Sequence, residues 1–171
     1  MNEFEELFHA DIHQYGGNPS KWNKKFTYLF RKIQTCNNKI LCKIYKKMYF
    51  PFIEKNGIEI DPICKIGAGF YLGHPFNITI NPNAVIGKKC SLHKGVTIGQ
   101  ENRGKRKGTP ILGNRVWVGV NSTIVGNIKI GDDVLIAPNT LVNSDIPSHS
   151  IVIGNPCKIL PKEDATKEYI L

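Results

Sequence analysis

A hydrophobic residue recurs at every sixth position through the middle of the chain, and this spacing constrains the fold more than any other feature. The positions form three series, which are Ile60, Ile66, Leu72 and Ile78, then Ile80, Ile86, Leu92 and Ile98, then Leu112, Val118, Ile124, Ile130, Ile136 and Val142. An α-helix repeats about every 3.6 residues and a half-buried strand about every 2, so neither alone produces a strict six. A hexapeptide period predicts a parallel β-helix of stacked coils with these residues inside.

Two irregularities interrupt the period. After Leu72 the spacing slips by two residues across the segment His-Pro-Phe-Asn at 74–77. After Ile98 comes a polar and basic insertion, GQENRGKRKGTPI, at 99–111. Packing of a repeat scaffold does not require such an insertion, and insertions in solenoids gather on one face that often binds ligands. We therefore expect the loop to have a function, with a neutral surface loop as the alternative.

The regions on either side of the repeats have a different pattern. Residues 1–57 carry apolar stripes at helical spacing and are predicted to form two or three short helices, ended by Pro51, that cap the open end of the coil. Residues 58–160 form the predicted β-helix domain, and 161–171 a C-terminal helix or tail.

Composition excludes several classes of protein. The chain has 171 residues, of which 41% are hydrophobic. Without an apolar stretch of about 18 residues it is not expected to span a membrane. The acidic start, MNEFEELFHADIHQ, is unlike a secretory signal. Five cysteines without a CxxC pair indicate reduced thiols in a cytoplasmic protein and neither disulfides nor a zinc site, so no metal is expected.

The net charge of +9 is unevenly distributed. Nine Lys or Arg residues and no acid lie between Lys21 and Lys47, and a second basic cluster lies in the 99–111 insertion. Such charge is either a solvated surface or a site that attracts anions, namely a phosphorylated cofactor, an anionic glycan or an anionic membrane face. Nucleic acid is not an expected partner, because the chain lacks a recognition-helix pattern or a basic sheet interleaved with aromatic residues.

Four segments resemble a known family. GHPFNITINPNAVIG (73–87), LHKGVTIG (92–99), the run from 116 to 142 and VIGNPCKI (152–159) resemble the hexapeptide-repeat acyltransferases. The branch indicated is that of the serine acetyltransferases, with relatives that acetylate sugars in surface-polysaccharide biosynthesis. The resemblance implies a left-handed β-helix, a homotrimer with sites between subunits, and acetyl-CoA as the acetyl donor.

The residues that match the family's motifs suggest a catalytic centre. A hydroxyl acceptor must lose a proton as it attacks a thioester, and a neutral imidazole is suited to accept it. His74 matches the catalytic histidine of the family, which implies a general base. Glu59 occupies the position of the family's aspartate, fifteen residues earlier, and Asp61 is the substitute. His93, on the next coil, is expected either to contact the acceptor or to have a structural role.

Two departures from the family concern the acceptor. Gly73 stands where serine acetyltransferases carry an aspartate, and Thr109 where they carry a histidine. Both replacements remove charged contacts expected for a serine zwitterion. A sugar acceptor in polysaccharide biosynthesis is therefore the favoured interpretation, with Arg103 and Arg106 of the insertion available to bind an anionic acceptor.

Two alternatives stay open at this stage. One is serine O-acetylation in cysteine biosynthesis. The other is a non-catalytic β-helix scaffold that docks on a membrane-bound complex through the basic segment between Lys21 and Lys47.

The resemblance also implies where acetyl-CoA lies. The family holds an extended pantetheine along a groove between two β-helices, with matching positions here at Gly119, Asn121, Ser122 and Ala137. Lys158 would meet the phosphorylated end of the cofactor. The expected mechanism is direct acetyl transfer in a ternary complex, because no cysteine has the motif of an acyl-enzyme nucleophile.

Overall fold

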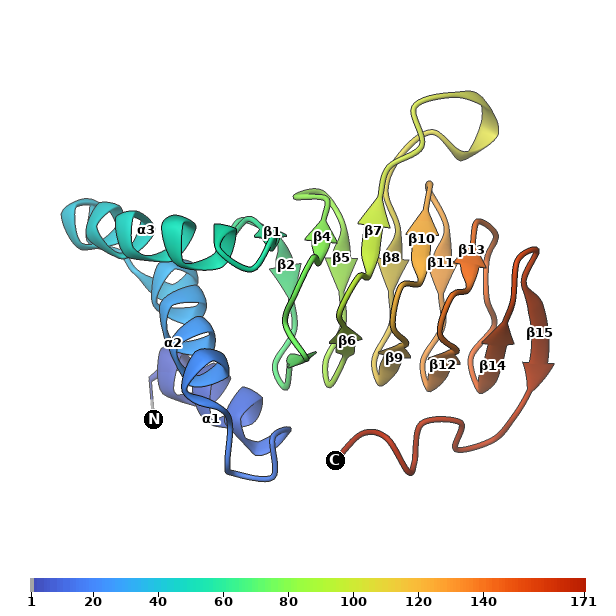
Figure 1. Cartoon of the computed structure of the whole chain (residues 1–171), viewed down its shortest axis with the longest axis horizontal. Coiled ribbons are helices and arrows are strands. Elements are labelled where there is room, and N and C mark those ends of the chain that lie inside the picture. Colours follow the sequence, from blue (N-terminus) through green and yellow to red (C-terminus); the bar gives the residue numbers. More distant parts are fainter. Residues whose placement is uncertain (1) are drawn as a thin grey trace.

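Three helices lead into a long coil of short strands in the computed structural model, which describes residues 2–171 (Figure 1). The helices are α1 (Glu3–His13), α2 (Lys21–Thr35) and α3 (Lys39–Glu54). They stand at the first coil and cover its open end, as the sequence predicts.

Polar side chains fix where each helix begins. Asn2, Ser20 and Asn38 are the N-caps, and each accepts a hydrogen bond from a backbone N–H of the first turn. Pro51 does not end the third helix, contrary to the prediction, because α3 continues to Glu54. Near a helix end the proline costs one backbone hydrogen bond, and the packed turn around Tyr49 and Ile53 maintains the helix.

The coil is built from three sheets, called A, B and C here. Sheet A contains, in spatial order, β1 (Glu59–Ile60), β4 (Thr79–Ile80), β7 (Thr97–Gly99), β10 (Thr123–Val125) and β13 (Leu141–Val142). Sheet B contains β2 (Lys65–Ile66), β5 (Val85–Ile86), β8 (Ile111–Leu112) and β11 (Lys129–Ile130). Sheet C contains β3 (Tyr71–Gly73), β6 (Ser91–His93), β9 (Val116–Val118), β12 (Val134–Ile136), β14 (Ser150–Ile153) and β15 (Lys158–Pro161). Successive strands pass from A to B to C.

The interior of the coil consists of columns of aliphatic side chains. In sheet A the register aligns Ile60 with Ile80, Ile80 with Ile98, Ile98 with Ile124 and Ile124 with Val142. All five side chains are buried. The named strands pair in parallel, except for the antiparallel hairpin of β14 and β15 that closes the coil. The parallel β-helix predicted from the six-residue period is confirmed.

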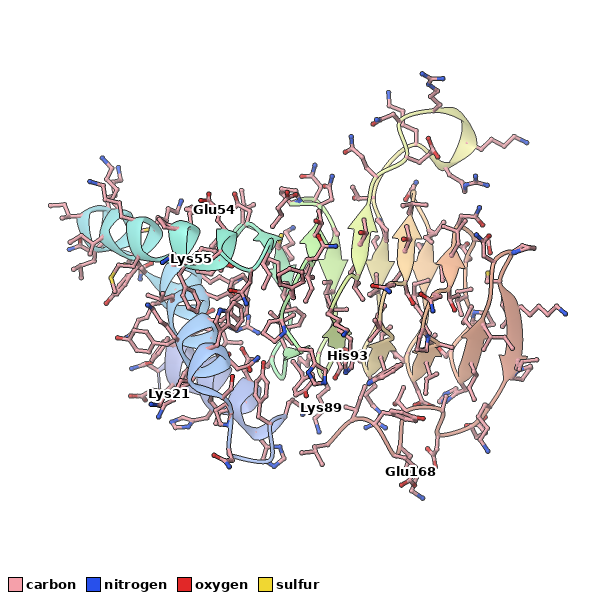
Figure 2. The ribbon with its side chains drawn as sticks, in the orientation of Figure 1. Lys21, Glu54, Lys55, Lys89, His93 and Glu168 are labelled. Carbon is pink, nitrogen blue, oxygen red and sulfur yellow. The ribbon has the colours of Figure 1, made fainter. Side chains whose placement is uncertain are left out.

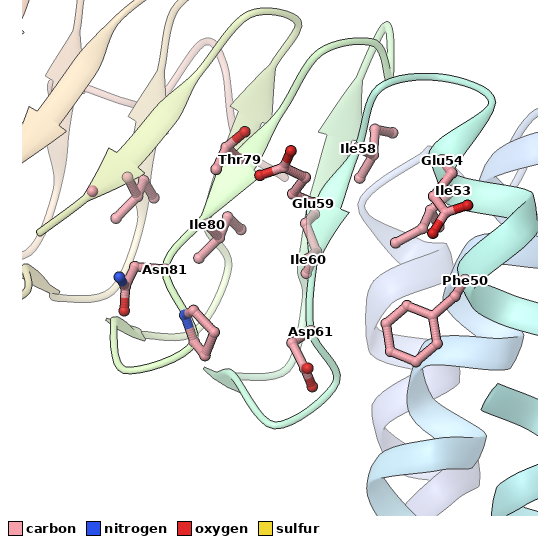
Figure 3. A pocket seen from close by; sticks show the side chains of 13 residues that line it. Phe50, Ile53, Glu54, Ile58, Glu59, Ile60, Asp61, Thr79, Ile80 and Asn81 are labelled. Atoms are coloured by element: carbon pink, nitrogen blue, oxygen red, sulfur yellow. The ribbon is translucent and has the colours of Figure 1, made fainter.

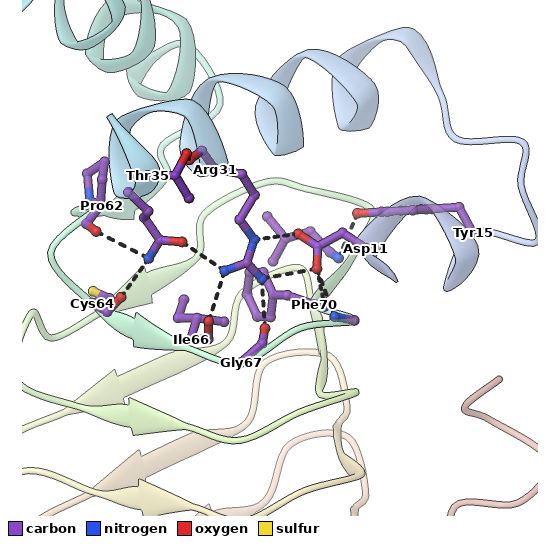
Figure 4. A network of polar contacts seen from close by, with 12 residues as sticks. Asp11, Tyr15, Arg31, Thr35, Pro62, Cys64, Ile66, Gly67 and Phe70 are labelled. Atoms are coloured by element: carbon purple, nitrogen blue, oxygen red, sulfur yellow. Dashed lines mark hydrogen bonds and ion pairs between the residues drawn. The ribbon is translucent and has the colours of Figure 1, made fainter. Parts of the chain in front are cut away.

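A buried ion pair joins the helices to the coil (Figure 4). The Asp11 carboxylate of α1 accepts hydrogen bonds from Arg31 Nε at 2.7 Å and Nη2 at 3.0 Å. The backbone N–H groups of Gly69 and Phe70 also donate to Asp11, both at 2.8 Å. Arg31 further donates to the Gly67 carbonyl, and its side chain is 1% exposed. This pair fixes α1 and α2 on the first coil.

The C-terminal tail folds back along the coil toward the helices (Figure 1). Asp133 anchors it, accepting hydrogen bonds from the Ala165 N–H at 2.9 Å, the Thr166 N–H at 3.0 Å and the Thr166 hydroxyl at 2.7 Å. His149 Nδ1 lies 3.0 Å from the same carboxylate. The carbonyl of Leu171 accepts a hydrogen bond from the side chain of Gln14, the C-cap of α1, so the tail connects the last coil with the first helix.

Docking of the tail is expected to depend on pH. Burial raises the pKa of Asp133, but its hydrogen bonds from Thr166, His149 and Ala165 outweigh burial and lower the pKa to about 2. The hydrogen bond to Asp133 raises the pKa of His149 above its ordinary 6.5. The Asp133 contribution is complete above its ordinary pKa of 3.8, and the His149 contribution is complete below 6.5. The tail should therefore be held most firmly between these two values.

Hydrogen exchange tests this pH dependence. After correction for intrinsic rates, the amides of Ala165 and Thr166 should exchange more slowly at about pH 5.5 than at about pH 8.5, where a smaller fraction of His149 is protonated. In a His149→Gln variant this difference should disappear. Equal protection of the wild-type tail at both pH values would contradict the assignment.

Candidate active site

His74 lies outside the coil at a widened turn. It follows β3, where the chain passes from sheet C to sheet A, in the segment that contains the predicted two-residue slip. Its φ of 52° is left-handed, a conformation in which histidine is enriched among non-glycine residues. The side chain is exposed. The slip therefore directs this imidazole away from the aliphatic interior.

His93 lies on the next coil with one ring nitrogen in use. Its Nδ1 is 3.1 Å from the Val118 carbonyl oxygen, which can only accept, so Nδ1 carries the proton and Nε2 is left as an acceptor. Burial lowers the pKa of His93, the Val118 bond raises it in opposition, and the charge of His74 lowers it further. His93 is thus a neutral imidazole at neutral pH, close enough to His74 to be affected by its charge.

Gly73 is glycine because the His93 ring occupies the space above it. The register pairs Gly73 with His93, and a Cβ added at Gly73 would lie 2.6 Å from His93 Nε2. Any side chain here would displace the imidazole. The His93 ring therefore occupies the space that a side chain at position 73 would need. Sequence reasoning considered the missing aspartate and His93 separately.

A Gly73→Ala substitution tests this arrangement. The added methyl group should displace the His93 ring from its place over residue 73 and disturb the Nδ1–H bond to the Val118 carbonyl, so the pKa of His93 changes. NMR titration of the imidazole measures this change, with Gly99→Ala as the control because a Cβ at Gly99 has its nearest contact at 3.3 Å. An unchanged His93 titration in Gly73→Ala would contradict the packing described.

Aromatic rings hold His93 in place along the outer face of sheet C. The His93 ring centroid lies 5.9 Å from that of Tyr71 and 4.6 Å from that of Trp117. Trp117 in turn lies 4.9 Å from Tyr169 of the tail. Sequence reasoning missed this row, although an outward Trp117 between the inward Val116 and Val118 was a signal of it.

Glu59 and Asp61 lie in a cavity of about 410 Å³ between sheet A and the end of α3 (Figure 3). Glu59 is on the outer face of the sheet, in register with Thr79. Asp61 accepts a hydrogen bond from the Ile63 N–H at 2.9 Å and so stabilises its own turn. Within the described residues no hydrogen bond or ion pair joins Glu59 to His74, and the catalytic dyad of these two stays a prediction.

The cofactor positions share an edge of the prism with His74. This C–A edge, where sheet C passes to sheet A, consists of residues 73–78, 94–96, 119–122 and 137–140. Its turns are joined by backbone hydrogen bonds, such as those from the Lys94 N–H to the Gly73 carbonyl and from the Asn121 N–H to the Lys94 carbonyl. His74, Gly119, Asn121 and Ala137 thus lie along one edge of the prism on different coils, and their roles in cofactor binding stay predictions.

Two of the predicted cofactor contacts are refined by their surroundings. The Ser122 side chain is fully buried, and its hydroxyl donates to the Ala137 carbonyl at 2.9 Å. Because this hydroxyl is hydrogen-bonded within the coil, only the backbone of Ser122 is available to contact a ligand. At Gly119 a Cβ would lie 2.6 Å from the Pro138 nitrogen, so glycine permits the close approach of adjacent coils. Lys158 is exposed on β15.

The inserted loop leaves the prism from a different edge. It joins β7 to β8, between sheets A and B, and stands away from the coil (Figure 1). The Thr109 hydroxyl donates to the Asn83 carbonyl at 3.1 Å, which anchors one end of the loop. Within residues 2–171 no ion pair involves Arg103 or Arg106. In a single chain, sheet A therefore separates this loop from His74.

The buried cysteines are unsuited to nucleophilic catalysis. Burial raises the pKa of the Cys64 thiol to about 11 and that of Cys90 to about 12. Both thiols are protonated at neutral pH, where a nucleophile must be a thiolate. Among the described residues there is also no group of three His, Cys, Asp or Glu side chains that could hold a metal ion.

Comparisons with known proteins agree with this architecture. The family described as bacterial transferase hexapeptide (six repeats) matches residues 109–144. A serine acetyltransferase of Helicobacter pylori is 40% identical over 107 residues, which are 63% of this chain and 63% of that protein. Serine acetyltransferase 2 of Arabidopsis thaliana is 39% identical over 124 residues, covering 66% of this chain and 38% of that protein. The chain thus spans less than two thirds of the length of these relatives.

Solved structures extend the likeness to the helices. The serine acetyltransferase of Neisseria gonorrhoeae in complex with serine aligns with a TM-score of 0.71 and 26% identity, covering 92% of this chain and 69% of that one. The soybean serine acetyltransferase apoenzyme shares the fold, with a TM-score of 0.73 and 22% identity over 92% of this chain and 69% of that one. The chain thus carries the bacterial transferase hexapeptide repeat at residues 109–144, and its coil is similar in sequence to those of serine acetyltransferases.

Proposed function

We propose that this chain is an acetyl-CoA-dependent O-acetyltransferase. The observation that carries the proposal is the exposed imidazole of His74 on the same prism edge as the positions that match the cofactor contacts of the family. Homology to serine acetyltransferases along the coil supports it. A purely structural scaffold would not require an imidazole to be directed outward at a widened turn.

The proposed mechanism is direct transfer. His74 accepts the proton of the acceptor hydroxyl as its oxygen attacks the carbonyl carbon of the thioester. The carbon–sulfur bond then breaks, and the protonated imidazole returns a proton to the departing thiolate of CoA. A carboxylate that accepts the other imidazole N–H would stabilise the cation, and Glu59 is the proposed group.

Serine is the acceptor that the comparisons favour. The curated relatives named above are serine acetyltransferases, and the Neisseria structure contains serine. The comparisons therefore support serine O-acetylation, which the sequence analysis left open as an alternative, over the saccharide acceptor that the sequence analysis favoured. For serine, the proposed contact is a hydrogen bond from its ammonium group to Nε2 of His93, which the Nδ1–H bond to Val118 leaves as an acceptor.

A saccharide hydroxyl is the second candidate, and one observation favours it. Because the His93 ring fills the space above Gly73, no carboxylate can stand there to pair with an ammonium group. A neutral imidazole flanked by Tyr71 and Trp117 suits a polar, uncharged acceptor at least as well.

A homotrimer would unite the separated parts of the proposed site. In one chain the loop with Arg103 and Arg106 and the edge with His74 lie on opposite sides of sheet A. Packing of prisms side by side would bring the loop of one chain to the C–A edge of the next. Sedimentation equilibrium should therefore give three times the chain mass.

Release of free thiol from acetyl-CoA tests the function and distinguishes the acceptors. Purified protein is incubated with acetyl-CoA and either serine or a panel of nucleotide sugars, with acetyl-CoA alone as the blank. Serine-dependent release is the expected result. Release only with sugars would establish the second candidate, and no acceptor-dependent release together with no acetyl-CoA binding in calorimetry would overturn the proposed function.

A further inference from the structure

The first half of α3 extends into open space beyond the other helices (Figure 1). None of residues 39–48 is buried, and the first buried side chain of the helix is that of Tyr49. Cys42 and Tyr45 pack against the core with part of their surface, and the helix is anchored further along by the buried Tyr49 and Ile53. Residues 39–48, called the free half here, therefore rest on the body along one face and present their other faces to solvent.

Large apolar side chains form a stripe along the free half. Ile40 is 72% exposed, Leu41 46%, Ile44 48% and Met48 50%. At about 100° per residue, the spacing i, i+1, i+4 and i+8 places these four within an arc of about 100°. An exposed, continuous apolar stripe of this kind marks an interaction surface.

Lysines lie beside the stripe on the same half of the helix. Lys39, Lys43, Lys46 and Lys47 are exposed, and among the described residues none of them is in an ion pair. No acidic residue occurs between Lys21 and Lys47. Nitrogen-tipped side chains surround this end of the helix in Figure 2. Of the nine basic residues in the segment, Arg31 is neutralised by Asp11, and the other eight contribute positive charge.

We propose that the free half of α3 binds the surface of an anionic membrane. The stripe of Ile40, Leu41, Ile44 and Met48 would enter the boundary between head groups and acyl chains, while the lysines contact lipid phosphates. The positive charge of the lysines is complementary to the negative charge of an anionic membrane, and this favours a membrane as the partner. A second copy of the same face would bring lysine clusters together without acids to compensate, and a nucleic acid would leave the apolar stripe exposed to water.

The geometry suits a helix that lies on the surface. No helix among residues 2–171 is long and apolar enough to cross a bilayer. A lysine near an anionic surface contributes about 1 kcal/mol, which corresponds to about a fivefold change in the partition coefficient. This proposal does not depend on the proposed acetyl transfer, since α3 lies at the opposite end of the coil from Lys158 and outside the C–A edge.

Vesicle co-sedimentation of the full chain tests the proposal. Phosphatidylcholine vesicles with phosphatidylserine should bind the protein at low ionic strength, and phosphatidylcholine vesicles alone should bind it weakly. A Lys43→Gln/Lys47→Gln variant should partition about 25-fold less. An Ile40→Ser/Ile44→Ser variant should lose at least tenfold. Lys65→Gln/Lys129→Gln, with the same charge change on exposed residues of sheet B, should lose much less.

Three results would overturn the proposal. The first is binding that does not differ between the two kinds of vesicle. The second is an equal loss in the sheet B control and in the α3 lysine variant. The third is no vesicle binding together with a change of oligomeric state in Ile40→Ser/Ile44→Ser, seen by sedimentation velocity, which would assign the stripe to a second copy. Circular dichroism confirms that each variant is folded.

Discussion

Replacement of His74 by alanine is expected to lower kcat by a factor of about 10² to 10⁴, the range typical of losing a general base. The side chain is exposed at the C–A edge, so its removal should leave the coil and acetyl-CoA binding unchanged. Steady-state release of free thiol measures the rate, and calorimetry measures cofactor affinity.

The matched control is His9→Ala, which removes an exposed imidazole from α1. It should retain the wild-type rate. If His74→Ala kept more than about one tenth of the wild-type kcat, a base role for this residue would be ruled out.

Replacement of Asp11 by alanine is expected to destabilise the protein by about 3 to 5 kcal/mol, because it leaves the Arg31 guanidinium buried without its partner. The same change removes the acceptor for the Gly69 and Phe70 N–H groups. Chemical unfolding in urea measures the loss, and the first coil should be affected together with the helices because the carboxylate joins them (Figure 4).

Glu6→Ala is the control for charge, since Glu6 is exposed on the same helix. Its effect should be within about 0.5 kcal/mol, as for other surface substitutions. A loss of less than about 1 kcal/mol in Asp11→Ala would mean that the pair does not connect the helices to the coil energetically.

The coil could be predicted from the sequence because its information is local and repeated. Every sixth residue is apolar and buried inside the coil, as at Leu112, Val118, Ile124, Ile130 and Ile136. Because the pattern repeats from coil to coil, a wrong assignment at one position would conflict with the assignments of its neighbours. The same logic located the widened turn at 74–77, since any slip in a strict period is visible.

Contacts that occur only once could not be predicted in this way. The carboxylate of Asp11 meets Gly69 across 58 residues, and that of Asp133 meets Thr166 across 33. Asp11 lies outside the family-like segments, and Asp133 lies within one of them without an assigned role. An aspartate on a helix or at a turn is ordinarily a surface residue. Their partners become apparent only when the helices and the tail are folded onto the coil.

The candidate site was predicted in part. The motif matches selected His74, at the slip in the period, and further positions that the coil places on the same edge, while their roles stay predictions. The packing of His93 over Gly73 depends on the register between neighbouring coils. Comparison of the sequence with the family motif does not reveal that register. The positions of Glu59 and of the loop relative to His74 likewise depend on three-dimensional placement.

The inserted loop leaves the pairing around it intact. Val85 still pairs with Ile111 across the insertion, and β7 still pairs with β10. After the loop, the chain therefore re-enters the coil in the same strand register that it would have without the insertion. A segment of another length and chemistry could therefore replace this loop without a change in the strands that carry it.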